Sequence, residues 1–339
     1  MAIALDGAVT VASESSGQGP FLSVVVPVYN EGEALHALHS RLTAVLRQMP
    51  VSRWEIVLVD DGSRDTSFEV IRDLAAADPA VRGLRFARNF GKEAGMAAGL
   101  RAAAGDVVVL MDGDLQHPPE LLPEMLQRWT DGAQMVTAVR RSRQTDPTTR
   151  RLASRMFYWL FHYVSEVEIP EGAGDFRLFD RAVVDAINSL PERNRFMKGI
   201  TSWVGFRQVL IDFEPAERVG GQSAWPFLRL FRYALDGISA FSMVPLRVWS
   251  IAGVTIALLS VIYGGWLVVR TLIWGIDVPG YASLMVAGLF TSGIQLISLG
   301  ALGEYIGRIF NEVKGRPLYI VADRVGQDPR SDAKTETRS

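Results

Sequence analysis

The first 240 residues alternate between two hydrophobic periods. Short apolar runs rich in β-branched residues predict strands over 22–29, 54–60, 81–87, 106–111 and 134–139. Apolar residues recur at helical spacing between these runs, over 33–46, 66–77, 93–104 and 119–129. Strands that are apolar on both faces and alternate with helices are typical of a mostly parallel sheet. The pattern therefore predicts an α/β domain.

A different pattern follows this domain. Every residue between Arg247 and Arg270 is uncharged, and so is every residue between Asp277 and Glu304. Each stretch exceeds the roughly 20 residues that span a hydrocarbon core. Buried core helices are the alternative, but these are usually shorter and carry a polar stripe. The sequence predicts two transmembrane helices, at about 248–269 and 281–303.

The connection between the two predicted spans is short and contains Pro279, which predicts a hairpin with both ends on one side of the membrane. Arg270 is the only basic residue at the connection. The basic residues that flank the other ends are Arg229, Arg232, Arg247, Arg308, Lys314, Arg316 and Arg324. By the positive-inside rule, we expect a multi-pass protein of the plasma (inner) membrane with its main body and tail in the cytoplasm.

Composition narrows the classes of function. The chain of 339 residues has 35 basic and 37 acidic residues, a net charge of −2, so no basic surplus favours nucleic acid as a partner. It has no cysteine, which excludes disulfides and thiolate metal sites. The first 20 residues begin without basic residues and become Ser/Gly-rich, which favours a disordered leader over a signal peptide.

Polar clusters follow three of the predicted strands. They are Tyr29-Asn30-Glu31, Asp60-Asp61-Gly62-Ser63 and Asp112-Gly113-Asp114-Leu115-Gln116. Turn chemistry could explain one such cluster, but ligands of parallel sheets bind where strands end, and three clusters at equivalent ends predict a ligand site. The glycine motifs of dinucleotide-binding and P-loop proteins are absent from the sequence.

The third cluster suggests a metal. Asp112, Asp114 and Gln116 alternate along an extended segment, so their oxygen ligands fall on one side of it. Such ligands suit Mg²⁺ or Mn²⁺, whose other ligands would be diphosphate oxygens and water. His117 is a candidate for the surrounding shell.

Six motifs occur in order along the chain. They are PVYNE at 27–31, VDDGSRDTS at 59–67, NFGKEAGMAAGL at 89–100, MDGDLQHPPE at 111–120, DFRLFDR at 175–181 and GGQS at 220–223. With the two apolar stretches they resemble the polyprenyl-phosphate glycosyltransferases of glycosyltransferase family 2, which include bactoprenol glucosyltransferases and dolichol-phosphate mannose synthases. The resemblance covers about residues 20–320. It implies a GT-A fold (Rossmann-like, with a mostly parallel sheet), a nucleotide-sugar donor, a divalent metal and inversion at the anomeric carbon.

The resemblance also implies roles for individual residues. Those expected to bind the nucleotide sugar are Pro27, Tyr29, Glu31, Val59, Asp60, Asp61, Asp112, Gly113, Asp114 and Arg140. The metal would be held by Asp112, Asp114 and Gln116. Asp175 stands where the family places its catalytic carboxylate. Its alternative is a helix cap or turn residue, a role that Asp180 fits better because 181–190 has the pattern of a helix.

A further set is expected to hold the acceptor phosphate: Arg150, Ser154, Arg218, Gln222 and Ser223. Arginine grips phosphate oxygens bidentately, although a solvated basic face is the plainer interpretation. The chain departs from the family at Ala224, where a lysine usually follows the serine. One phosphate contact is therefore missing or supplied elsewhere.

These predictions combine into one organisation. We expect a leader over 1–20, the GT-A domain over 21–225, an interfacial helix over 226–243, the spans within 244–306, and a tail over 307–339. A β-prone run at 316–322 is expected to pair with a strand edge, on a neighbouring subunit if the chain forms a homo-oligomer. The expected activity is inverting transfer of a hexose from UDP-glucose to undecaprenyl phosphate at the cytoplasmic membrane face.

Three alternatives stay open at this point. The donor could be GDP-mannose, with a polyprenyl or dolichol phosphate as acceptor. The chain could be a non-catalytic sugar-nucleotide-binding membrane protein, which the intact acidic motifs oppose. A processive polysaccharide synthase would carry a QxxRW helix and many spans, and the segment 195–203 has no such motif.

Overall fold

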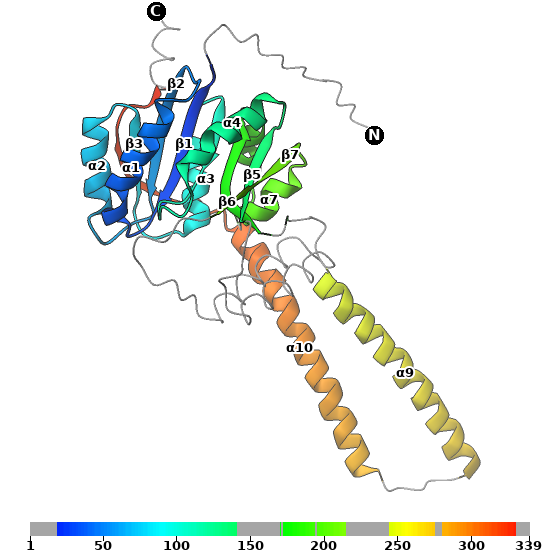
Figure 1. Ribbon diagram of the computed structural model, residues 1–339. Coiled ribbons are helices and arrows are strands. Elements are labelled where there is room, and N and C mark those ends of the chain that lie inside the picture. The colour runs from blue at the N-terminus through cyan, green and yellow to red at the C-terminus, as the bar shows by residue number, and fades with distance from the viewer. Residues whose placement is uncertain are drawn as a thin grey trace, which may run out of the picture.

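The structure, a computed structural model, describes residues 19–140, 170, 172–193, 195–214, 244–274 and 280–329. A twisted sheet lies between two layers of helices, and two long helices extend away from it (Figure 1). The predicted interfacial helix over 226–243 lies outside the described residues.

Eight strands form one sheet in the order β7-β5-β6-β4-β1-β2-β3-β8. Neighbouring strands run parallel except that β6 is antiparallel to β4 and β5, and β8 is antiparallel to β3. The mostly parallel sheet is thus confirmed. The strands are β1 (Phe21–Val28), β2 (Arg53–Asp60), β3 (Val81–Phe86), β4 (Val107–Leu110), β5 (Met135–Arg140), β6 (Ala173–Asp180), β7 (Gln208–Phe213) and β8 (Val321–Val325).

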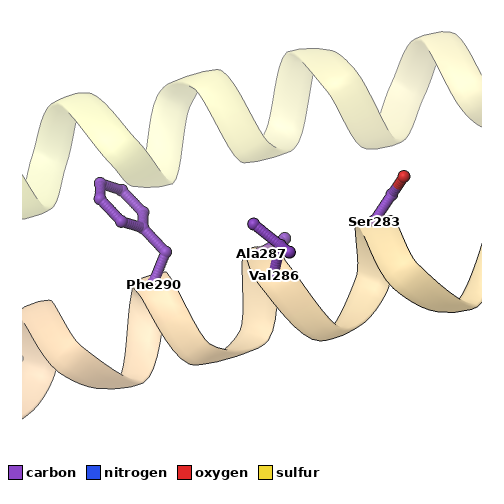
Figure 2. A pocket seen from close by; sticks show the side chains of 4 residues that line it. All are labelled: Ser283, Val286, Ala287 and Phe290. Atoms are coloured by element: carbon purple, nitrogen blue, oxygen red, sulfur yellow. The ribbon is translucent and has the colours of Figure 1, made fainter.

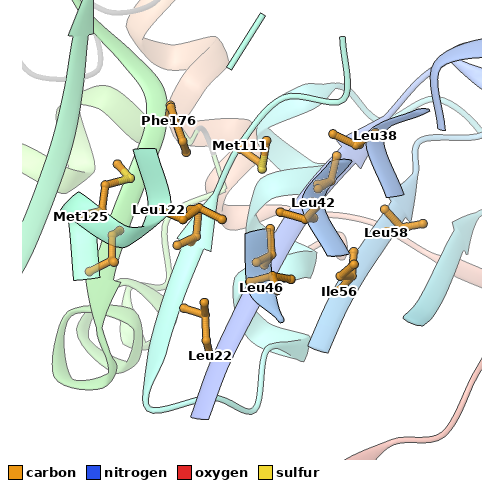
Figure 3. Close-up of a cluster of buried hydrophobic side chains, with 14 of the residues drawn as sticks. Leu22, Leu38, Leu42, Leu46, Ile56, Leu58, Met111, Leu122, Met125 and Phe176 are labelled. Atoms are coloured by element: carbon orange, nitrogen blue, oxygen red, sulfur yellow. The ribbon is translucent and has the colours of Figure 1, made fainter. Parts of the chain in front are cut away.

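Helices cover both faces of the sheet, as the two-sided apolar strands predict. Successive residues of β1 point to opposite faces, so Val24 and Val26 belong to one core cluster and Val25 to the other. Figure 3 shows part of the first cluster, where leucines of α1 pack on β1 and β2. The helices are α1 (Gly32–Leu46), α2 (Ser67–Ala77), α3 (Lys92–Ala102), the 3-10 turn η1 (Pro119–Leu121), α4 (Leu122–Thr130), α6 (Arg181–Ser189) and α7 (Met197–Trp203).

Two strands of this sheet, β6 and β7, are not predicted from the sequence. In β6 the apolar residues are interrupted by Arg177, yet this side chain is only 2% exposed. Its guanidinium donates to the carbonyl of Gly174 and to the hydroxyl of Thr201. A carbonyl of the same strand and a hydroxyl of α7 therefore accept hydrogen bonds from a charged group that local sequence patterns count against a buried strand.

The end of β6 confirms the helix predicted after Asp180. The Asp180 carboxylate accepts the backbone N–H of Ala182 at 2.9 Å, which caps α6. Its other oxygen accepts the indole N–H of Trp129 at 2.8 Å. Asp180 is therefore the capping residue of this segment, and Asp175 lies inside β6, away from any helix end.

The two apolar stretches form α9 (Val244–Trp274) and α10 (Tyr281–Val313). Their candidate spans, 248–274 and 283–313, have mean hydropathies of 2.0 and 1.6, and their apolar side chains are exposed. An exposed apolar helix pair of this length is suited to a lipid environment. Side chains of α10 line a cavity of ≈ 440 Å³ on the side facing α9 (Figure 2): Ser283, Val286, Ala287 and Phe290.

The segment after α10 returns to the sheet. β8 pairs with β3 over Gly83–Phe86, and the ring of Tyr319 stacks on Phe86 with centroids 4.9 Å apart. Arg82 pairs with Asp328 at 2.9 Å. The predicted pairing of the tail with a strand edge is confirmed, with the strand at 321–325. The edge belongs to the same chain, so this strand gives no support to a homo-oligomer.

We expect Tyr319→Ala to lower the free energy of unfolding by about 2 kcal/mol, because it removes an aromatic pair that anchors the returning segment. Urea unfolding of the detergent-solubilised chain, followed by tryptophan fluorescence, measures this. Tyr319→Phe keeps the ring and is the control. Equal stability of the two variants would show that the stacking is not what anchors the segment.

Candidate functional site

The predicted polar clusters lie at one edge of the sheet. β4, β1 and β2 are neighbours and run parallel, so the loops that follow them emerge side by side. This edge, formed by the residues after the carboxyl ends of β1, β2 and β4, is called the carboxyl edge below. It is where ligands bind in open α/β sheets.

The loops after β1 and β2 are cross-linked. The backbone N–H of Asn30 donates to Ser63 Oγ, the N–H of Arg64 donates to Asn30 Oδ1, and the N–H of Glu31 donates to Ser67 Oγ, each at 2.9 Å. Asn30 has a φ of 54°, in the left-handed region that asparagine tolerates better than most residues. The loop is therefore held rigidly, and Tyr29 stands 44% exposed on it.

The two aspartates after β2 face inward. Asp60 is fully buried and accepts the N–H of Ser63 at 3.1 Å, while the Asp61 carboxylate accepts the N–H groups of Phe90 at 2.6 Å and Gly91 at 2.9 Å. Burial raises the pKa of both carboxyl groups, and these hydrogen bonds oppose the rise. Asp61 thereby fixes the loop after β3 to the loop after β2.

The remaining residues of the predicted nucleotide site lie on the strands themselves. Pro27 is paired in register with Val59 across β1 and β2. The Val59 side chain is fully buried in the core, so it could contact a nucleotide only through its backbone. The structure brings these residues together at the carboxyl edge, and their contact with a donor stays a prediction.

The acidic motif after β4 has the predicted alternation. Asp112, Asp114 and Gln116 are partly exposed, whereas the residues between them are buried. The N–H of Gln116 donates to Asp114 Oδ1 at 3.1 Å, and Leu115 has a φ of 61°. The Asp114 carboxylate is therefore tied to its own loop through one of its two oxygens.

His117 supports the same motif from behind. Its Nδ1 accepts the backbone N–H of Asp112 at 2.9 Å, and its ring stacks on Phe176 with centroids 5.0 Å apart. Burial lowers the pKa of His117, which favours the neutral ring that this acceptor role requires. His117 therefore positions Asp112.

Antiparallel pairing of β4 and β6 brings the predicted catalytic carboxylate to the acidic motif. Leu110, the last residue of β4, is opposite Arg177 in the register, so the segment after β4 that carries Asp112 leaves the sheet beside the part of β6 that carries Asp175. Both carboxylates contact the same ammonium group. Lys92 Nζ, at the start of α3, lies 2.6 Å from Asp112 Oδ1 and 2.6 Å from Asp175 Oδ2.

The charges in this cluster perturb one another. Burial opposes the charged form of Lys92, but Asp175 and Asp112 outweigh it and raise the lysine pKa above its usual range. Burial alone would raise the pKa of Asp175, yet the positive charges of Lys92, Lys198 and Arg177 hold it below its usual range. Asp175 is therefore ionised at neutral pH.

Glu93 is the second titratable residue at the start of α3. Burial, followed by the negative charge of Asp175, raises the pKa of Glu93 to about 7. Its carboxylate accepts the backbone N–H of Met197 at 3.0 Å, which ties α3 to the start of α7. Near neutral pH this carboxyl group is therefore partly protonated, which reduces the negative charge beside Asp175.

Lys92 and Glu93 have no role predicted from the sequence, although both lie in the motif NFGKEAGMAAGL. The glycine before Lys92 and the small residues that follow mark a tight helix start, but they do not show which carboxylates the lysine reaches. That information depends on the register between β4 and β6.

Arg140 ends β5 and lies on the same edge, beyond β6. Its Nε is buried and has no hydrogen-bond partner among the described residues. Such a group is available to an anionic ligand. The predicted acceptor residues Arg150, Ser154, Arg218, Gln222 and Ser223 lie outside the described residues.

The donor set at this edge fits a divalent cation. Asp112, Asp114 and Gln116 supply carboxylate and amide oxygens, which hard cations prefer. The ammonium of Lys92 against Asp112 shows that the position attracts positive charge. In the described part of the chain, no three His, Asp or Glu side chains gather into a metal-binding group.

Gly113 separates the two aspartates and has a close neighbour. A Cβ built at Gly113 would collide with Glu31 Oε2 and would also come within 3.4 Å of Val26 Cγ1. The glycine therefore lets the Glu31 carboxylate pack against the acidic motif.

We expect Gly113→Ala to fold normally but to weaken nucleotide-sugar binding about tenfold, because the methyl group displaces the flexible Glu31 side chain, an effect of about 1.4 kcal/mol. Isothermal titration with UDP-glucose and Mn²⁺ measures the dissociation constant. If the effect acts through Glu31, adding Gly113→Ala to Glu31→Ala will cost little more. Fully additive losses would contradict this explanation.

Comparison with known proteins adds the family. Residues 23–187 match the family described as Glycosyl transferase family 2, and residues 244–309 match the GtrB C-terminal hairpin. An uncharacterized glycosyltransferase of Synechocystis sp. is 47% identical over 90% of this chain and 96% of its own length. The prophage-derived bactoprenol glucosyl transferase of Shigella flexneri is 47% identical over 88% of this chain and 97% of its own.

The prophage bactoprenol glucosyl transferase homolog of Escherichia coli is 44% identical over 88% of this chain and 98% of its own length. These matches span both the sheet domain and the two apolar helices. The resemblance, the GT-A fold and the hairpin expected from the sequence are confirmed, and the chain is a membrane-associated hexosyltransferase. It belongs to glycosyltransferase family 2.

Proposed function

We propose that this protein transfers glucose from UDP-glucose to a polyprenyl phosphate, undecaprenyl phosphate, with inversion at the anomeric carbon. The observation that carries the proposal is the cluster of Asp112, Lys92 and Asp175 beside Asp114 at the carboxyl edge. It places an acidic motif suited to a diphosphate-bound metal next to a second, ionised carboxylate. The bactoprenol glucosyl transferases among the relatives support the acceptor class and the sugar.

Asp112, Asp114 and Gln116 would hold Mg²⁺ or Mn²⁺. When bound, the cation neutralises the charge that develops on the departing nucleoside diphosphate. The rigid loop of Tyr29 and Glu31 would bind the nucleotide, and Arg140, with its buried unpartnered Nε, would contact phosphate.

The acceptor needs little activation. The second pKa of a phosphate monoester is about 6, so the lipid phosphate is largely dianionic at neutral pH and its oxygen attacks without a strong base. The main task of the site is then to align the oxygen with the anomeric carbon. Asp175, kept ionised by Lys92, would stabilise the positive charge that develops at that carbon.

The proposal includes a location. We place α9 and α10 across the plasma membrane with the sheet domain and the tail in the cytoplasm. The reason is that arginines precede the first apolar stretch and follow the second. Reporter fusions at Ser339 and within 273–280 are expected to report opposite sides of the membrane. The same side for both would mean that one of the two helices does not cross.

A transfer assay tests the activity itself. Detergent-solubilised protein is incubated with undecaprenyl phosphate, Mn²⁺ and either radiolabelled UDP-glucose or radiolabelled GDP-mannose, and label in the lipid phase is counted. Label from UDP-glucose supports the proposal. Label from GDP-mannose alone would make the protein a mannosyltransferase, and no label from any of a panel of nucleotide sugars would support a binding role.

A further inference from the structure

The ammonium of Lys92 contacts a carboxylate oxygen that the proposed metal ion would need as a ligand. It contacts Asp112 Oδ1, an oxygen of the acidic motif, at 2.6 Å. The other oxygen of Asp112 faces Nε2 of His117 at 3.8 Å. Both oxygens of this carboxylate therefore have a neighbour within the chain.

Lys92 also solves an electrostatic problem. Asp112 and Asp175 both lie 2.6 Å from Lys92 Nζ, and two carboxylates that close together repel each other. The ammonium contacts both at the same distance and compensates their charge. In its absence a cation from solution would be drawn to the same place.

The Lys92 ammonium can separate from Asp112 without a rearrangement of the fold. Its side chain is 45% exposed, whereas those of Asp112 and Asp175 are 27% and 18% exposed. Four flexible carbons carry the ammonium, so the contact can be exchanged without a backbone movement. The helix start that bears Lys92 is fixed independently, because Asp61 accepts the N–H groups of Phe90 and Gly91.

We propose that Lys92 is a positioning residue that occupies the cation's place at Asp112 until the nucleotide sugar arrives. The diphosphate and metal together displace the ammonium from Asp112, while Lys92 retains its contact with Asp175. The metal then binds tightly together with the nucleotide sugar, and its affinity for the protein without the nucleotide sugar is weak. This inference rests on the proposed role of Asp112 and Asp114 as metal ligands.

The inference has a thermodynamic signature. If the donor helps the metal to displace Lys92, donor and metal strengthen each other's binding by the same factor. Removing the ammonium frees Asp112 in advance. Donor-free metal affinity should then rise and the coupling between metal and donor should fall.

Titration of the full-length, detergent-solubilised protein with Mn²⁺ tests this, with free Mn²⁺ followed by electron paramagnetic resonance in the presence and absence of UDP-glucose. For Lys92→Met we expect donor-free Mn²⁺ affinity to rise about tenfold or more, since a positive charge in contact with the ligand is removed. The ratio of Mn²⁺ affinities with and without UDP-glucose should fall correspondingly.

Lys198→Met is the matched control. Lys198 acts on Asp175 through its charge, and no described contact joins it to Asp112. Removal of this lysine tests whether any lost positive charge would do, and we expect donor-free Mn²⁺ affinity within about twofold of the parent. Circular dichroism and unfolding temperature establish that both variants are folded.

Each outcome is informative. Equal donor-free affinities for the parent and Lys92→Met, with tight Mn²⁺ binding when UDP-glucose is present, would overturn the inference about Lys92 and leave the metal site standing. Equal gains in Lys92→Met and Lys198→Met would overturn it as well. Absence of Mn²⁺ binding by the parent even with UDP-glucose would overturn both the inference and the proposed metal site.

Discussion

Replacing Asp114 by alanine is expected to reduce sugar transfer at least about a thousandfold, or about 4 kcal/mol of transition-state stabilisation. The Asp114 carboxylate accepts the backbone N–H of Gln116 through Oδ1, which holds it on the loop after β4. Alanine would remove one of the two carboxylates of the proposed metal site. The side chain is partly exposed, so the fold should tolerate the change.

The rate of lipid labelling from UDP-[¹⁴C]glucose, measured in saturating Mn²⁺, checks this expectation. Asp131→Ala is the matched control, because Asp131 is an exposed aspartate at the end of α4 whose carboxylate accepts the side-chain amide of Gln127. Its activity should equal that of the parent. Full turnover of the parent protein in excess EDTA would contradict the metal dependence directly.

Asp175→Asn is expected to lower the turnover rate at least about a hundredfold, about 2.7 kcal/mol, while UDP-glucose affinity stays near normal. Asparagine has nearly the same shape but no charge, so Lys92 loses one of its two anionic partners and the reacting carbon loses the proposed stabilisation. A role as a helix cap does not compete, because Asp175 lies within β6 and Asp180 caps α6.

Asp180→Asn is the control for this change. Asparagine caps helices about as well as aspartate, so this variant should keep activity within a few-fold of the parent. Turnover comes from the transfer assay and donor affinity from titration calorimetry with Mn²⁺. A loss of donor affinity that matches the loss of rate in Asp175→Asn would move Asp175 into the nucleotide site.

The pH profile gives a second readout for Asp175. Its pKa is held below the usual range, so the carboxylate is ionised at neutral pH and loses its charge only as the pH falls through that lowered value. We expect the acid limb of the parent's rate to follow the lipid phosphate instead, with a midpoint near about 6. An acid limb that disappears in Asp175→Asn would show that the carboxyl group itself titrates there.

Much of this site follows from local sequence. The strands β1 and β4 are mainly apolar, and β2 is apolar from Ile56 to Val59. Polar residues follow each of these apolar runs, so the carboxyl edge was predictable from the chain alone. The alternation of exposed and buried residues was likewise predictable as far as Asp114, because an extended segment repeats every two residues. The left-handed backbone of Leu115 departs from that segment and was not predicted.

The rest depends on contacts between distant parts of the chain. The approach of Asp112 to Asp175 requires the antiparallel pairing of β4 with β6, which no local pattern specifies. Arg177 interrupts the apolar pattern of β6, and its bond to Thr201 of α7 forms only in the folded chain. Asp61 has a fold-building role that its place in a ligand motif does not reveal.

The position of β8 has a consequence for folding during synthesis on the ribosome. The ribosome releases 321–325 after α9 and α10, yet this strand covers the outer edge of β3. Until then β3 presents unpaired backbone groups, which are a template for association with other chains. A nascent chain that stalls while α9 and α10 are being made would therefore expose the unpaired edge of β3 and would be prone to aggregation. The sheet is complete only in chains in which both apolar helices have already been synthesised.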